Sequence, residues 1–286
     1  MTRLATLGRR LLRNPLSAFG LAVIALLVLA AALAPLLAPY PGDALGATVR
    51  PDRQFEPPGE EFWFGTDDLG RDLFSRVLFG ARISLLAGCM TIGLALVIGV
   101  PLGLLAGYAG GLTDEAIMRV TDVMLSFPPL LLAVAIAAAF GPSLTNAVIA
   151  TGLSWWPWYT RIIRSTAAGL RRREYVEAAR AAGAGHLAIM GRHILPNALP
   201  PVLVQASMDF GSVVLTTAAL GFLGLGAQAP QPEWGLMVAI GRNYFLTQPW
   251  VVVFPGLGIL ITVMAFNFLG DGLREVLDPR LSRARR

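Results

Sequence analysis

The side chains of this chain that offer chemistry gather in one charged segment, residues 171–196. It opens with three arginines, continues Glu-Tyr-Val-Glu-Ala-Ala-Arg-Ala-Ala-Gly, and holds both histidines, His186 and His193. No paired Cys/His spacing suggests zinc, so we assign no metal and read the histidines as loop residues. None of the 23 basic residues is lysine, so the chain lacks the residue with which a phosphate-binding loop reaches ATP. We expect no catalytic residue and a binding role for the segment.

The spacing within this segment predicts a two-faced helix followed by a second short helix. One face carries Tyr175, Ala178, Ala179 and Ala182. The other carries Arg173, Glu177 and Arg180, whose three- and four-residue spacings would let them pair. Gly183 is well placed to cap the first helix, and Pro196 to stop the second. Small residues on the first face permit close approach to a partner's groove; a solvated hairpin without a partner is the alternative.

Composition places this segment beside a membrane. The 286 residues are 55% hydrophobic and 14% charged, and the mean hydropathy is +0.62. Such a chain has too little polar surface to cover a water-soluble globule, so we expect an all-α polytopic membrane protein. The net charge of +5 comes from arginines at the ends of apolar runs, which favours a topology signal over nucleic-acid binding. The lone cysteine, Cys89, cannot form a disulfide within the chain.

Uncharged runs predict six transmembrane helices in a single membrane domain, residues 1–286. The expected spans are residues 17–37, 84–108, 116–139, 144–163, 197–226 and 251–269. An external loop, residues 40–82, and a cytoplasmic loop, residues 164–196, separate them. Seventeen of the 23 arginines then face the cytoplasm, as the positive-inside rule requires, and both termini are cytoplasmic. Gly99, Gly103, Gly107 and Gly111 repeat every four residues and predict close helix packing.

A few polar residues near membrane depth need partners. Asp122 and Asp209 are costly there unless they face a partner or water. Arg119 lies one turn before Asp122, so we expect a structural ion pair between them in preference to a role of Arg119, Asp122 or Asp209 in substrate passage. Outside the membrane, Thr66-Asp67 is expected to start an amphipathic helix rather than a calcium loop.

Several motifs together resemble a known family. Glu177-Ala178-Ala179, then Gly183 and Leu195-Pro196, resembles the EAA loop of permease subunits in bacterial ATP-binding-cassette importers, with His193 where the general pattern has isoleucine. The chain also resembles the dipeptide/oligopeptide/nickel permease family, and its opening is most similar to the C-type subunit of peptide importers. The residues that carry this are Arg13-Asn14-Pro15, residues 64–72 and 80–82, Asp122 with Ser126-Phe127-Pro128, residues 219–226, and residues 270–274 with 278–280.

The resemblance implies a type I importer permease in the bacterial plasma (inner) membrane. Its partners would be a homologous second permease, two cytoplasmic ATPases that bind ATP and Mg, and an extracytoplasmic substrate-binding protein; this chain would bind no cofactor. Di- or oligopeptides are the expected substrates, and nickel chelates, glutathione or opines also fit the family. An autonomous carrier or channel is the alternative. The implied ATPase-coupling residues are Tyr175, Glu177, Ala178, Ala179, Arg180, Gly183 and His186.

Overall fold

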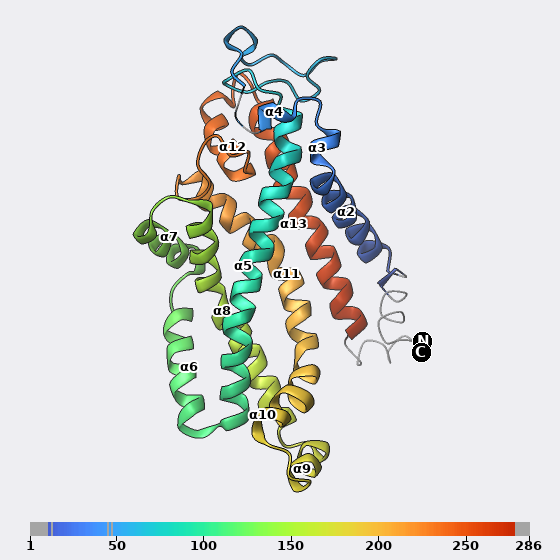
Figure 1. The fold of residues 1–286 in the computed structure, drawn as a ribbon, viewed down its shortest axis with the longest axis vertical. Helices are drawn as coiled ribbons and strands as arrows, with labels where there is room; N and C mark the ends of the chain where they lie inside the picture. Colours follow the sequence, from blue (N-terminus) through green and yellow to red (C-terminus); the bar gives the residue numbers. More distant parts are fainter. Residues whose placement is uncertain (1–10, 13, 45, 47, 278–286) are drawn as a thin grey trace.

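The computed structural model describes residues 11–12, 14–44, 46 and 48–277, and within them the chain folds into helices without strands. Long helices run side by side along the molecule (Figure 1). The helices outside the charged segment are α2 (Pro15–Ala32), α3 (Ala34–Leu37), α4 (Pro41–Ala44), α5 (Leu73–Ala109), α6 (Gly111–Leu125), α7 (Pro129–Phe140), α8 (Leu144–Leu170), α11 (Leu195–Phe222), α12 (Trp234–Gly241) and α13 (Trp250–Leu277). The predicted all-α class is confirmed.

Three of the four repeating glycines bring α5 against α8. A Cβ added at Gly99, Gly103 or Gly107 would lie 2.4 to 2.6 Å from a backbone oxygen of α8. The Thr160 hydroxyl of α8 also donates a hydrogen bond to the Gly99 carbonyl, 3.1 Å away. Gly111 differs, because it has positive φ where α6 begins and nothing lies near its would-be Cβ. The predicted close packing therefore holds for residues 99–107 only.

Four of the described helices are long and apolar enough to cross a membrane: α2, α5, the continuous helix His186–Phe222 and α13. The third expected span, residues 116–139, is not one straight helix. It is divided between α6 and α7, which meet at 90°. Pro128 lies at the break, where its preference for an extended neighbour ends α6. The helix α8 is 27 residues long, but its arginines and tryptophans lower its hydropathy. Six spans therefore remain a prediction.

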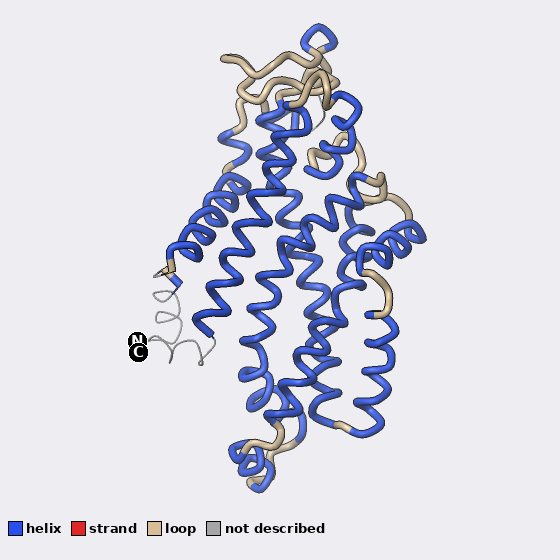
Figure 2. Tube along the Cα trace, turned by 180° about the vertical axis from the view of Figure 1, so that it is seen from behind, coloured by secondary structure: helices blue, strands red, loops and turns tan. Residues whose placement is uncertain are grey.

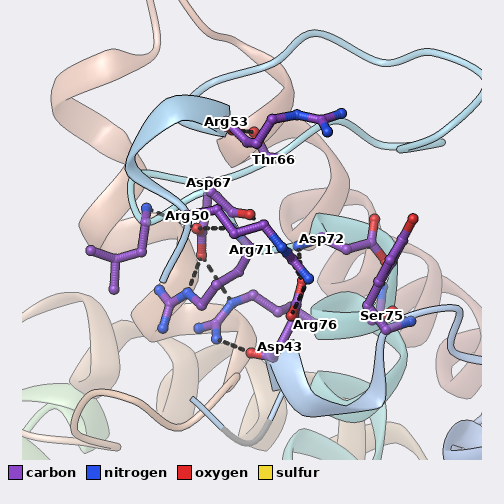
Figure 3. A network of polar contacts seen from close by, with 12 residues as sticks. Asp43, Arg50, Arg53, Thr66, Asp67, Arg71, Asp72, Ser75 and Arg76 are labelled. Carbon is purple, nitrogen blue, oxygen red and sulfur yellow. Dashed lines mark hydrogen bonds and ion pairs between the residues drawn. The ribbon is translucent and has the colours of Figure 1, made fainter. Parts of the chain in front are cut away.

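The segment between α4 and α5 covers one end of the bundle and is held there by a buried polar network (Figure 3). Asp67 binds Arg71 at 2.7 Å and Arg76 at 3.2 Å. Asp43 accepts from Arg50 at 2.7 Å and from the Asp72 amide at 2.7 Å. These bonds tie residues distant in sequence to the start of α5, which gives an irregular loop a fixed shape.

The external helix expected to start at Thr66-Asp67 is absent from the described residues. Asp72 caps α5 instead, accepting from the Ser75 amide at 2.8 Å, so the helix begins at Leu73. Asp67 accepts from the Leu69 and Arg71 amides, a local turn that competes with helix. The pKa of Asp68 is raised, mainly because the carboxyl is buried and secondly because the negative charge of Asp67 lies close to it.

The charged segment and this loop lie at opposite ends of the long axis (Figure 2). Figure 2 also shows α2 and α13 side by side. The Asn14 side chain donates to Glu275 at 2.6 Å, which joins the start of α2 to the last turns of α13. The chain termini themselves, whose cytoplasmic placement is a prediction, lie outside the described residues.

Candidate functional site

The first helix of the charged segment is α9 (Glu174–Ala181), and it ends in a complete glycine cap. Gly183 has φ of +82°. Its amide donates to the Arg180 carbonyl at 3.0 Å, and the Ala184 amide donates to the Ala179 carbonyl at 3.0 Å. This pair of bonds is the motif that lets a left-handed residue close a helix, so the predicted cap at Gly183 is confirmed.

The second helix does not stop where the sequence analysis expected. Helix α10 (His186–Ala188) passes into a π-helical turn, η2 (Ile189–Ile194), which continues without a break into α11. Pro196 stands in the first turn of α11, where a missing amide is tolerated, so it does not separate the two. The expected stop at Pro196 is therefore wrong. A partner bound here would act directly on the end of α11.

Two contacts fix α9 to the helix that follows it. Val176 is the one buried residue of α9. The Tyr175 hydroxyl donates to the His193 carbonyl at 3.4 Å, and the Asn197 side chain donates to the same carbonyl at 2.7 Å. Ile189 and Ile194 are fully buried and hold η2 against the bundle. The hairpin is thus anchored at its base.

The two faces of α9 have different surroundings. Tyr175, Ala178 and Ala182 are exposed, so the face of small side chains is open to solvent. Glu177 and Arg180, on the other face, line an open pocket of about 430 Å³. The expected ion pairs among Arg173, Glu177 and Arg180 do not form among the described residues. The open face is therefore the one available to a large partner.

The charged face of α9 looks toward the ends of α5 and α8. The Tyr108 hydroxyl and Nδ1 of His186 lie 2.7 Å apart. Arg171 donates to the Tyr108 carbonyl at 3.1 Å, which ties the end of α8 to the end of α5. His186 and Arg171 belong to the charged segment, but their contacts with Tyr108 could not be predicted, because sequence spacing does not show which helix ends meet.

The expected ion pair between Arg119 and Asp122 is wrong. Arg119 contacts Glu115 at 3.6 Å on its own helix, whereas Asp122 pairs with Arg161 of α8 at 2.5 Å. Both side chains of the Arg161 pair are about half exposed. A second pair between the same helices, Arg164 with Asp114, has its shorter contact at 2.5 Å. These contacts bind α6 to α8.

Asp209 lies apart from Asp122, on α11. It accepts a hydrogen bond of 2.8 Å from Gln205, one turn earlier. The fully buried Tyr159 of α8 lies next to it, and the Tyr159 hydroxyl has no hydrogen-bond partner of ordinary geometry. Among the described residues, no hydrogen bond or ion pair joins Arg119, Asp122 and Asp209 into one site.

Comparisons with known proteins agree with this architecture. The family model described as binding-protein-dependent transport system inner membrane component matches residues 99–283. A second model, the N-terminal TM domain of oligopeptide transport permease C, matches residues 2–58.

Individual relatives match over almost the whole chain. The chain is 46% identical to the dipeptide transport system permease protein DppC of Alkalihalophilus pseudofirmus, covering 96% of this chain and 88% of that protein. It is 48% identical to the probable D,D-dipeptide transport system permease protein DdpC of Escherichia coli K12, covering 93% and 88%. Among solved structures, an inward-facing MetNI methionine ABC transporter shares the fold, with a TM-score of 0.56 and 22% identity over 72% of this chain and 98% of that one.

Proposed function

This chain belongs to the family of binding-protein-dependent transport system inner membrane components, and from this premise we propose that it forms half of the translocation path of an ATP-driven importer for di- or oligopeptides. A homologous second permease would supply the other half. Two cytoplasmic ATPase subunits would bind and hydrolyse ATP with Mg, and a binding protein outside the membrane would deliver substrate. The chain is then a non-catalytic membrane subunit. An autonomous carrier or channel is not favoured, because the matched family works with a binding protein.

The observation that carries the coupling role is the open face of α9. Exposed alanines leave room for a groove of another protein to approach the helix backbone closely. The Gly183 cap and the buried Val176 hold that face in a fixed orientation. We assign ATPase coupling to Tyr175, Glu177, Ala178, Ala179, Arg180, Gly183 and His186.

Coupling follows from the continuity of the helix behind α9. ATP would favour one arrangement of the ATPase pair, and a rigid contact at α9 would bias the same two-state equilibrium in the membrane. Because η2 and α11 form one helix, a movement at His186 is carried into the bundle. Asp209 and Gln205 lie on α11, and we assign them, rather than Asp122, to the candidate substrate path.

A substitution at the helix cap tests this assignment. Gly183→Val places a β-branched residue at positive φ, which strains the cap and misdirects α9. We expect the protein to insert normally and the ATPases to copurify less well, while peptide import falls and ATP hydrolysis no longer responds to loaded binding protein. Ala178→Phe, which adds bulk to the open face, should act in the same way.

Gly185→Val is the matched control. Gly185 has φ of −67°, and no atom lies within 4 Å of its would-be Cβ, so valine fits without strain. It should transport like the parent. Normal import together with normal ATPase stimulation in Gly183→Val and Ala178→Phe would show that the hairpin is solvated and that the ATPases bind elsewhere.

A further inference from the structure

The pocket behind α9 is positively charged and its cations lack partners. Three arginines, Arg171, Arg172 and Arg180, line it together with His186, against the single carboxylate of Glu177. Among the described residues none of these arginines forms an ion pair. Arg171 alone has a hydrogen bond from its side chain, to the Tyr108 carbonyl.

Two arginines earlier in the chain, on α8, do have acidic partners. On α8, Arg161 and Arg164 each bind an aspartate of α6 at 2.5 Å. About two to three turns later the chain places Arg171 and Arg172 beside an open pocket of about 430 Å³. Glu177 lines the same pocket, but among the described residues no carboxylate forms an ion pair with either arginine. Several unpaired guanidinium groups around one polar pocket repel one another, and an anion relieves that repulsion.

The position of the pocket limits what the anion can be. The residues that line the pocket come from the ends of α5 and α8, from α9 and from the start of α10; Figure 1 shows α9 and α10 at the lower end of the molecule. The apolar helix α5 ends at Ala109, and Tyr108, whose amphipathic ring suits a membrane–water boundary, forms part of the wall. Basic pockets between helix ends on the cytoplasmic side of a membrane suit phosphate headgroups.

We propose that this pocket binds the phosphate headgroup of an anionic phospholipid. The guanidinium groups of Arg172 and Arg180 would hold the phosphate oxygens, and the contact between Tyr108 and His186 would close the wall on the α5 side. A bound headgroup would join the ends of α5 and α8 to the charged face of α9, opposite the open face that carries Tyr175, Ala178 and Ala182. Because Arg180 and His186 are also among the residues assigned to ATPase coupling, the experiment substitutes Arg172, which is not one of them. The proposal depends on the membrane location of the family and not on the proposed substrate or ATPase contact.

Lipid binding to the purified complex tests this proposal. Native mass spectrometry of the complex in detergent would follow the most tightly bound molecule of dioleoylphosphatidylglycerol during a titration. Arg172 is exposed in a turn and forms no ion pair, so Arg172→Gln should leave the fold intact. One arginine near an anionic membrane surface strengthens lipid binding about fivefold, so we expect Arg172→Gln to bind phosphatidylglycerol about fivefold more weakly than the parent. Arg172→Lys, which keeps the charge, should recover most of that loss.

The matched control is Arg192→Gln, which removes the same charge from the same hairpin at an exposed position outside the pocket. It should bind phosphatidylglycerol like the parent. Equal affinities in Arg172→Gln and Arg192→Gln would overturn the proposal, as would equally tight binding of dioleoylphosphatidylcholine to the parent. Millimolar inorganic phosphate that displaces the lipid with the same dependence on Arg172 would assign the pocket to a free anion instead. Loss of transport without loss of lipid binding would bear on the proposed function alone.

Discussion

The ion pairs of Asp67 and of Asp122 differ in burial, and burial decides how much each contributes to the stability of the fold. Asp67 is bound by two arginines, Arg71 and Arg76, whose side chains are 4% and 2% exposed. The pair between Asp122 and Arg161 has side chains 56% and 51% exposed. A buried carboxylate that contacts two buried cations is hard to replace, whereas an exposed pair competes with water and salt.

We therefore expect Asp67→Asn to destabilise the chain strongly and Asp122→Asn to have little effect. Removing the partner of a buried cation costs about 3 to 5 kcal/mol, and an exposed pair contributes about 1 kcal/mol or less. The measurement is the thermal unfolding midpoint of each purified variant in the same detergent. Similar shifts for the two variants would mean that the buried network does not anchor the loop. Arg119→Gln should behave like the parent, because its side chain is 79% exposed.

The wrong partner for Asp122 shows what spacing leaves open. Arg119 and Asp122 are three positions apart, which is about one helix turn, so the sequence alone favoured that pair. In the structure Arg119 points to solvent, and Arg161, 39 positions away, supplies the cation. Spacing constrains partners on one helix, but a partner from another helix depends on how the two helices pack.

Among the helices, the sequence predicted that the glycine stripe of α5 packs closely against a neighbour, and the structure shows that this neighbour is α8. Glycines at four-residue spacing remove side chains from one stripe, and that physical requirement is visible without a structure. The break between α6 and α7 was missed, although Ser126-Phe127-Pro128 lies at it, because an uncharged run satisfies the length of a span whether it is straight or bent. Pro196 was misread as a stop because a proline in a first helical turn has the same sequence appearance.

A pair of alanine substitutions on α5 tests the glycine stripe. Gly103→Ala would place its Cβ 2.4 Å from the Thr160 carbonyl oxygen, so α5 and α8 must separate. Overpacking of this kind costs about 1 to 3 kcal/mol, and we expect a lower unfolding midpoint and lower yield. Gly93→Ala, on the same helix with no atom within 4 Å, should be neutral or gain up to about 1 kcal/mol from helix propensity. If Gly103→Ala proves as stable as Gly93→Ala, the helices do not depend on this contact.

For the molecule as a whole, the sequence predicted the all-α class correctly, whereas the number of spans and their orientation stay predictions. The arginine asymmetry predicts that the charged segment and the loop of residues 40–82 face opposite sides. In the structure α5 begins at Leu73, within that loop, and the part before α5 lies at the other end of the long axis from the charged segment. The hydropathy of α8 is lowered by polar residues that have partners on other helices: Thr160 bonds to α5, and Arg161 and Arg164 pair with aspartates of α6.

Cysteine labelling tests that sidedness directly. In a background with Cys89→Ser, Gly59→Cys in the exposed loop should react with a membrane-impermeant maleimide in intact cells, and Gly191→Cys only after permeabilisation. Ser282→Cys, which lies outside the described residues, should behave like Gly191→Cys. Labelling of the Gly191 position in intact cells would reverse the orientation, and labelling of the Ser282 position alone would change the number of spans.

The π-helical turn Ile189–Ile194 has a geometric consequence for everything that follows it. A π turn holds one residue more than an α turn, and each residue of an α-helix advances the chain by about 100° around its axis. The azimuth of α11 is therefore set by a single inserted residue in the hairpin. Without it, the side of α11 that carries Gln205 and Asp209 would point about 100° away from Tyr159. The length of this short turn therefore determines which side chains of α11 face the interior of the helix bundle.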